Sequence, residues 1–266
     1  MQVAADNSSV SRSLLLGFAA IAPLLSILLI GTHILVALLP IFVSHMLMLY
    51  ATLVPNSQWW GPVATRFQTT ERAVWLTIDD GPSLAHTLKL LDLLEQFEAK
   101  ATFFVIGETA ERHPHLVTEI LMRGHAVANH TYTHPSRTFW CAGPWKIAHE
   151  LEKCDEPLRS TPERPAVYFR APAGHKNMFV HPALARRGMM LIGWTVRGLD
   201  TVLRDPLRVV DRIEKAAKPG AIIVLHEGWP LERDPDFIVR CLELTLQRLA
   251  SRGFRFVIPH PDQLRA

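Results

Sequence analysis

Two adjacent carboxylates, Asp79 and Asp80, are the first side chains in the sequence whose type and placement suggest chemistry. They close an apolar run over residues 73–78 and are followed at once by Gly81-Pro82. An apolar run stopped by Gly and Pro is typical of a buried strand, which would carry both carboxylates to its C-terminal end. Neighbouring like charges repel, and burial adds a desolvation cost that a metal ion or a cationic partner would remove. The alternative is an ordinary Asp-Gly turn.

Two histidines spaced four residues apart, His130 and His134, follow a later strand-like run. If the backbone coils there, both rings fall on one face and can share a metal ion. With Asp80 they form a set of two histidines and one carboxylate, which leaves coordination positions open for water and substrate. The alternative is that both are polar core or surface histidines.

Three further polar residues lie at or after the ends of apolar runs. Arg170 can pair with a carboxylate and keep it ionised, or it can form a surface salt bridge of little energy. His226 ends the run 221–225, and the titration range of histidine suits proton transfer. Asp200 could orient a histidine.

Strand-like and helix-like segments alternate after residue 72, which implies parallel pairing and right-handed crossovers. The pattern predicts strands at 74–79, 101–106, 125–129, 167–170, 191–195, 221–226 and 254–258. It predicts helices at 85–97, 108–123, 145–159, 181–187, 206–217 and 236–252. About seven such units fit either an imperfect barrel or an open doubly wound sheet.

The amino-terminal part has a different composition, because residues 14–54 contain no Asp, Glu, Lys or Arg. As a helix this stretch would be about 60 Å long, roughly twice a hydrocarbon core of about 30 Å. We therefore expect two membrane spans, at 14–30 and 34–54, with Trp59 and Trp60 at the interface. A single span and a cleaved signal peptide are the alternatives. The expected organisation is a tail (1–13), a membrane anchor (14–54), a linker (55–72) and a catalytic domain (73–266).

Positive charges flank the predicted hairpin. Arg12 precedes the first span, Arg66 and Arg72 follow the second, and the turn at 31–33 carries no Lys or Arg. Because positive charge near a membrane stays cytoplasmic, we expect the catalytic domain on the cytoplasmic face of a bacterial inner membrane. A single span would reverse this orientation.

The overall composition narrows the choice of partners and compartment. The net charge is only +3 and the basic residues are scattered, so no nucleic-acid partner is expected. Cys141, Cys154 and Cys241 are odd in number and far apart, which predicts reduced thiols and neither a disulfide framework nor a metal motif.

Several of these segments together resemble the polysaccharide deacetylases of the NodB-homology group, carbohydrate esterase family four. The resemblance covers about residues 73–259. The matching segments, in chain order, are Thr77-Ile78-Asp79-Asp80-Gly81, Thr102-Phe103-Phe104, His130 to His134, Arg170 to Gly174, and Ile223-Val224-Leu225-His226. Each motif is weak alone, but their combination and order are specific.

The resemblance implies an α/β fold, a distorted (β/α)7 barrel, behind the transmembrane hairpin. It implies one divalent metal ion, usually zinc, held by Asp80, His130 and His134. Asp79 would be the general base and His226 the general acid. By the same resemblance Arg170 would hold Asp79, and Asp200 would support His226.

The implied activity is hydrolysis of an N-acyl group, acetyl or formyl, from an amino sugar of a glycan or of a lipid-linked saccharide. A carbohydrate O-acetyl esterase and an inactive carbohydrate-binding barrel are the alternatives.

Two departures from the family pattern affect the substrate pocket. The fourth motif, Asp-x-x-Asp-Trp, reads Arg197-Gly198-Leu199-Asp200-Thr201, and Ala173 stands where a tyrosine is frequent. The backbone N–H of Ala173 is the expected donor to the oxyanion.

Overall fold

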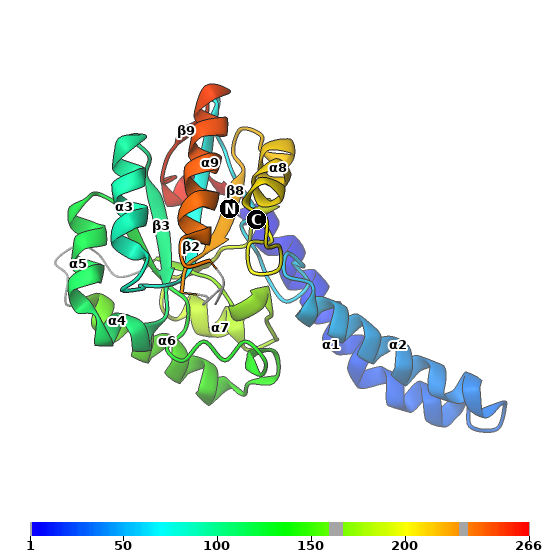
Figure 1. Cartoon of the computed structure of the whole chain (residues 1–266). Coiled ribbons are helices and arrows are strands. Elements are labelled where there is room, and N and C mark those ends of the chain that lie inside the picture. Colours follow the sequence, from blue (N-terminus) through cyan, green and yellow to red (C-terminus); the bar gives the residue numbers. More distant parts are fainter. Residues whose placement is uncertain (1, 160–166, 229–233, 266) are drawn as a thin grey trace.

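The computed structural model describes residues 2–159, 167–228 and 234–265. An α/β domain is built on one curled parallel sheet, and a helical hairpin projects from it (Figure 1). The strand order is β6-β5-β4-β3-β2-β8-β7, with β9 pairing to β2. The strands are β2 (Ala73–Gly81), β3 (Ala101–Val105), β4 (Ala126–Asn129), β5 (Tyr168–Phe169), β6 (Met190–Leu191), β7 (Val196–Arg197), β8 (Ile222–His226) and β9 (Arg255–Phe256). This half-barrel confirms the predicted distorted barrel.

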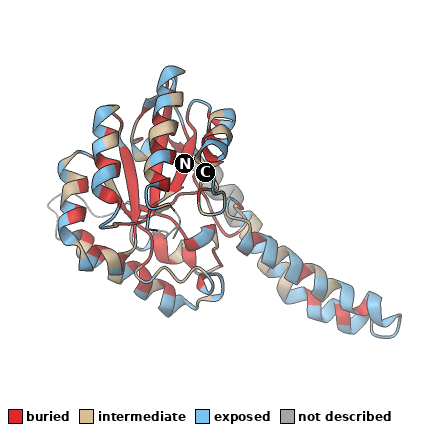
Figure 2. Ribbon diagram, viewed as in Figure 1, coloured by how far each residue is buried: buried red, intermediate tan, exposed pale blue. Residues whose placement is uncertain are grey.

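Helices cover the outside of the sheet, and the strands between them are almost entirely buried (Figure 2). They are α3 (Thr87–Gln96), α4 (Gly107–Arg112), α5 (Pro114–Met122), α6 (Pro144–Arg159), α7 (Val180–Ala185), α8 (Pro206–Ala216) and α9 (Phe237–Ser251). Strands buried on both faces need near-continuous apolar sequence, as β2 and β8 have. In the parallel register Asp79 lies opposite Phe104 on β3 and His226 on β8.

Two predicted elements differ from the structure for local reasons. The helix predicted at 108–123 is divided at His113, because Pro114 has no N–H to continue the helical hydrogen bonds and instead starts α5. The strand predicted at 191–195 ends at Leu191, and a separate strand, β7, begins at Val196. Between them Gly193 donates its N–H to the carbonyl of Ala64 in the linker.

The segment between the hairpin and β2 is part of the sheet edge. Ala64 forms a parallel bridge with Ile192, and Arg66 forms an antiparallel bridge with Ala221. Within it β1 (Arg66–Phe67) pairs with β10 (Leu264–Arg265), just after the short 3₁₀ turn η3 (Pro261–Gln263). The predicted linker is therefore fixed along the β6–β7 connection.

The hairpin consists of α1 (Gln2–Leu28) and α2 (Ile34–Leu53), which pack against each other. Its turn lies far from the α/β domain (Figure 1). Two segments are long and apolar enough to cross a membrane, Val10–Leu28 and Ile34–Leu53. Many of their apolar side chains are exposed, among them Leu24, Ile27 and Leu35. Large exposed apolar surfaces mark membrane or protein contacts.

The domain end of the hairpin has a small apolar core of its own. Leu15, Ala51 and Trp60 are buried there, and Trp59 and Met178 pack against them. The Trp60 indole N–H donates to the Thr52 hydroxyl at 3.0 Å. The hairpin is therefore packed directly onto the α/β domain.

Candidate active site

Asp79 ends the buried part of β2 and is 2% exposed. Arg170, which follows β5, donates from Nη1 to Asp79 Oδ1 at 2.6 Å and to Thr77 Oγ1 at 2.7 Å. Its Nη2 donates to the Gly193 carbonyl at 3.0 Å, and its guanidinium lies 4.1 Å from the Phe104 ring centroid. A buried carboxylate with a charge-assisted bond to arginine is held in one orientation.

Asp80 lies between the two histidines. Its Oδ1 is 3.3 Å from Nε2 of His130 and 3.3 Å from Nε2 of His134. The ligand atoms of all three lie within 4.8 Å of one another. His130 Nδ1 is 2.9 Å from the Arg170 carbonyl. Because a carbonyl can only accept, Nδ1 carries the proton and Nε2 is left as a ligand atom.

The protonation states of this triad suit a divalent cation. Burial alone would raise the pKa of Asp80, but the close approach of His130, His134 and His226 lowers it below its usual range. Burial and the neighbouring His130 lower the pKa of His134 to about 4. At neutral pH the triad therefore offers a carboxylate and an unprotonated imidazole, the forms that bind a metal.

Left-handed backbone conformations cluster around these side chains. Of the six non-glycine residues with positive φ in the described ranges, only Glu98 lies away from the site. The other five are Asp80 (φ 70°), Thr131 (φ 67°), His134 (φ 49°), Ala173 (φ 53°) and Leu199 (φ 62°). Each such residue costs on the order of 1–3 kcal/mol and persists where the surrounding structure fixes it, as at active sites.

A buried acid that was not among the predicted site residues, Glu150, shapes the turn between the two histidines. Glu150 on α6 accepts the backbone N–H of Tyr132 at 2.9 Å and of Thr133 at 2.8 Å. It also accepts the Thr133 hydroxyl at 2.7 Å. Lys146 lies four residues before Glu150, a spacing typical of a solvent-exposed helical ion pair, so no local pattern indicates this role.

Asn129 and Thr77 were also missed as positioning residues. The Asn129 side chain accepts the N–H of Thr131 at 2.9 Å and donates to Asp155 at 2.7 Å. The Thr77 hydroxyl accepts from Arg170 and donates to the Ile223 carbonyl at 2.8 Å. Thr77 belongs to the first motif, and this contact gives its side chain a role.

His226 faces the same end of the sheet from β8, beside Asp79 in the register. Asp200 Oδ1 is 3.1 Å from His226 Nδ1, and Oδ2 accepts the His226 backbone N–H at 2.6 Å. Burial lowers the pKa of His226, but the charges of Asp200, Asp79 and Asp80 and the Asp200 hydrogen bond outweigh it and raise it to about 9. The ring is therefore an imidazolium at neutral pH and can donate a proton.

The structure thus brings all seven predicted site residues to the C-terminal end of the sheet.

A cavity of about 610 Å³ lies beside the triad. It is lined by Asp80, Pro82, Ser83, Leu84, Ala85, Ile106, Thr109, His113, His134 and Gly228. In the altered fourth motif, Arg197 has its guanidinium 5.9 Å from the Trp194 ring centroid, so the cation that replaces the usual acid lies against an aromatic ring.

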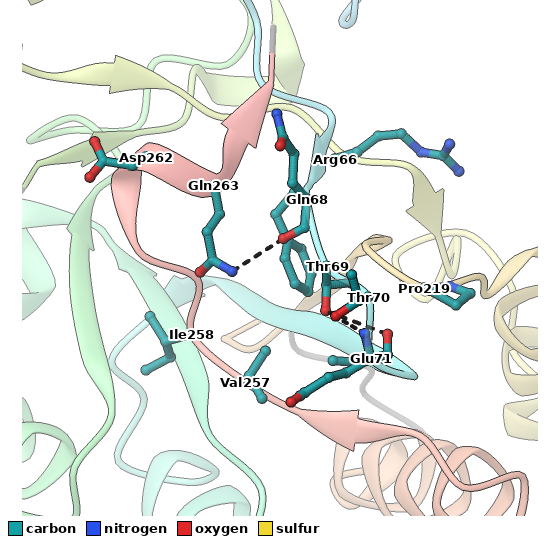
Figure 3. A pocket seen from close by; sticks show the side chains of 12 residues that line it. Arg66, Gln68, Thr69, Thr70, Glu71, Pro219, Val257, Ile258, Asp262 and Gln263 are labelled. Atoms are coloured by element: carbon teal, nitrogen blue, oxygen red, sulfur yellow. Dashed lines mark hydrogen bonds between the residues drawn. The ribbon is translucent and has the colours of Figure 1, made fainter.

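A larger hollow of about 880 Å³ lies at the other end of the sheet (Figure 3). It is formed by the linker around Gln68, the start of β2 and the segment around Gln263, whose side chain donates to the Gln68 carbonyl at 3.1 Å. None of the seven predicted site residues lines it. The smaller cavity is therefore the candidate substrate site, despite its size.

Comparison with known proteins gives consistent matches. A family model described as polysaccharide deacetylase matches residues 67–192. A chitooligosaccharide deacetylase from Bradyrhizobium sp. is 34% identical, over 71% of this chain and 89% of the relative. A peptidoglycan-N-acetylglucosamine deacetylase from Bacillus cereus is 31% identical, over 74% of this chain and 91% of the relative. The solved structure of a peptidoglycan N-acetylglucosamine deacetylase in complex with an N-hydroxybenzamide superposes with a TM-score of 0.67. It is 28% identical in sequence, and the match covers 73% of this chain and 89% of that chain.

Proposed function

The chain belongs to the polysaccharide deacetylase family and is a hydrolase of carbon–nitrogen bonds other than peptide bonds, and we propose that it is a membrane-anchored, metal-dependent N-deacetylase of amino-sugar saccharides. The observation that carries the proposal is one cluster at one end of the sheet. It joins the triad of Asp80, His130 and His134 to Asp79 held by Arg170 and to His226 held by Asp200. The two relatives named above are deacetylases of chitooligosaccharide and of peptidoglycan N-acetylglucosamine.

The triad would hold the divalent ion, which when bound supplies a Lewis acid and lowers the pKa of a water molecule towards neutrality. Asp79 is oriented by Arg170 and accepts the proton of the attacking water. His226 donates its proton to the departing amine as the carbon–nitrogen bond breaks. The backbone N–H of Ala173, in the turn η2 (Pro172–Gly174), is the proposed donor to the oxyanion. One water is consumed, and the products are a carboxylate and a free amino sugar.

A substrate panel tests the proposal. The purified full chain in detergent is offered N-acetylated chitooligosaccharides, a lipid-linked N-acetyl amino sugar, its N-formyl analogue and an O-acetylated sugar. We expect acetate and a free amine from the N-acetylated substrates. Release of acetate from the O-acetylated sugar alone would replace the deacetylase proposal with an esterase. No product from any substrate would favour the inactive barrel.

The pH profile tests the role of His226. We expect Asp200→Asn to move the alkaline limb of the kcat/KM profile to lower pH. The pKa of His226 is held at about 9 by Asp200 against the effect of burial, so removing the carboxylate lets the pKa fall and the acid loses its proton earlier. Initial rates from pH 6 to 11 measure the shift. An unmoved limb would mean that His226 is not the acid.

Membrane anchoring and orientation are part of the proposal. Two apolar helices in an antiparallel hairpin support two spans, which would leave the N-terminus and the catalytic domain on the same side. Arg12, Arg66 and Arg72 flank the hairpin, so we place the domain on the cytoplasmic face of the inner membrane. There it would meet lipid-linked saccharides before export, and we propose these as the natural substrate.

Reporter fusions test this orientation. Fusions joined after Arg72 should give a fluorescent GFP and an inactive alkaline phosphatase, because GFP folds in the cytoplasm and the phosphatase needs export. The same pair joined at residue 32, in the turn, should give the opposite result. Active phosphatase after Arg72 with no GFP fluorescence would place the domain outside.

A further inference from the structure

The end of the membrane hairpin contacts the two backbone segments that surround Arg170. On one side is the segment that follows Arg170, from η2 to Lys176. On the other side is the β6–β7 connection, 192–195, whose Ile192 and Gly193 carbonyls accept hydrogen bonds from the Arg170 guanidinium at 3.3 and 3.0 Å. Both segments are held by residues at the end of α2.

Lys176 forms the first contact, and it is 0% exposed. Its Nζ donates to the carbonyls of Val54 at 2.9 Å and Pro55 at 2.7 Å, and its backbone N–H donates to the Thr52 carbonyl at 3.1 Å. The Thr52 carbonyl belongs to the last turn of α2, and the Val54 and Pro55 carbonyls directly follow it. A helix presents partial negative charge at this end, which attracts a cation. Burial lowers the pKa of Lys176 to about 7, because an ammonium removed from water carries a desolvation cost.

Gly174 brings η2 itself against the same residues. A Cβ at Gly174 would lie 2.5 Å from Pro55 Cβ and 2.7 Å from the Trp194 ring, and its φ is +74°. Only a residue without a side chain permits this approach with this backbone. The turn that carries the proposed oxyanion donor therefore rests directly on Pro55, just after the C-cap of α2.

Asn56 forms the second contact, on the β6–β7 connection. Its Nδ2 donates to the Trp194 carbonyl at 2.8 Å, and its Oδ1 accepts the Trp194 backbone N–H at 3.4 Å. A Cβ at Gly193 would lie 2.4 Å from Asn56 Oδ1, so the amide fits closely over this residue. The Gly193 carbonyl accepts from the Arg170 guanidinium, which also donates to Asp79. Three consecutive contacts, Asn56–Trp194, Gly193–Arg170 and Arg170–Asp79, therefore connect the end of the hairpin to the proposed base.

We propose that the end of α2 is a structural part of the active site, and that Lys176 and Asn56 are positioning residues that hold the Arg170 segments in place. The inference rests on the proposed deacetylase function for its catalytic consequence. The anchor would then do more than keep the domain at the membrane. Its docked state would set the geometry of Arg170, Asp79 and the η2 turn.

The test uses full-chain Lys176→Met and Asn56→Ala in detergent, with Lys100→Met as the matched control. Lys100 also caps a helix end, donating to the Arg123 carbonyl at 2.7 Å, but at the opposite end of the sheet from the triad. We expect kcat to fall about 10- to 100-fold in the two test variants, with KM and metal content unchanged, because small misplacements of catalytic groups cost rates of this order. Lys100→Met should keep the wild-type kcat.

Hydrogen exchange on the same samples provides a readout independent of activity. Exchange should speed up in 171–177 for Lys176→Met and in 192–195 for Asn56→Ala, and in neither segment for Lys100→Met. Faster exchange with an unchanged kcat would overturn the positioning role, and unchanged exchange in both test variants would overturn the docking itself. An inactive wild type would count against the deacetylase function, while the exchange result would still decide the docking.

Discussion

Asp79→Asn is expected to lower kcat by about 10²–10⁴, the usual contribution of general acid–base catalysis, while the protein keeps its metal. The substitution preserves the size of the side chain that Arg170 contacts at 2.6 Å but removes its capacity to take a proton. His226→Ala should lower kcat by a similar factor, because the proposed proton donor to the amine is lost.

Asp92→Asn is the matched control for this prediction, since Asp92 is an exposed partner of Arg123 on the outer surface. It should keep the wild-type kcat and metal content. Single-turnover rates and metal analysis on the same preparations separate loss of chemistry from loss of the ion. A wild-type rate in Asp79→Asn would exclude it as the base.

Asp80→Ala, His130→Ala and His134→Ala are each expected to weaken binding of a divalent ion by more than about 100-fold, since even outer-shell partners contribute about 10–100-fold. Each substitution removes one of three ligand atoms that lie within 4.8 Å of one another. Competition with a chelator of known affinity measures the effect, and activity should disappear with the ion.

His115→Ala is the control for metal binding, because His115 is an exposed histidine on α5 that lies outside the triad. It should bind the ion as the wild type does. Full metal content in all three triad variants would show that the ion, if any, is held elsewhere.

The carboxylates and histidines of the candidate site could be predicted from the sequence because of how a parallel sheet is built. Asp79, Asp80 and His226 each end an apolar run, and parallel strands bring such ends to one edge. The helix predicted at 108–123 was wrong in one respect, because Pro114 divides it into α4 and α5, although proline is a local signal for such a break. Local pattern and spacing were sufficient for the strand ends.

Features that depend on distant contacts could not be predicted. Glu150 looks like half of a surface ion pair, and only the packing of α6 turns it inward onto the histidine turn. Lys176 has no local pattern that marks burial, because its partners lie about 120 residues earlier in the chain. The strand predicted at 191–195 is interrupted in the structure, where Ile192 pairs with Ala64 of the linker. Sequence periodicity does not reveal this pairing.

The most direct test of the proposed function is the stoichiometry of acetate and free amine released from an N-acetylated chitooligosaccharide by the full-length protein. The mechanism predicts one acetate for each new amine, no release after chelation, and recovery when a divalent ion is restored. Release that continues unchanged in the chelated protein, or acetate formed without a matching amine, would contradict a metal-dependent N-deacetylase.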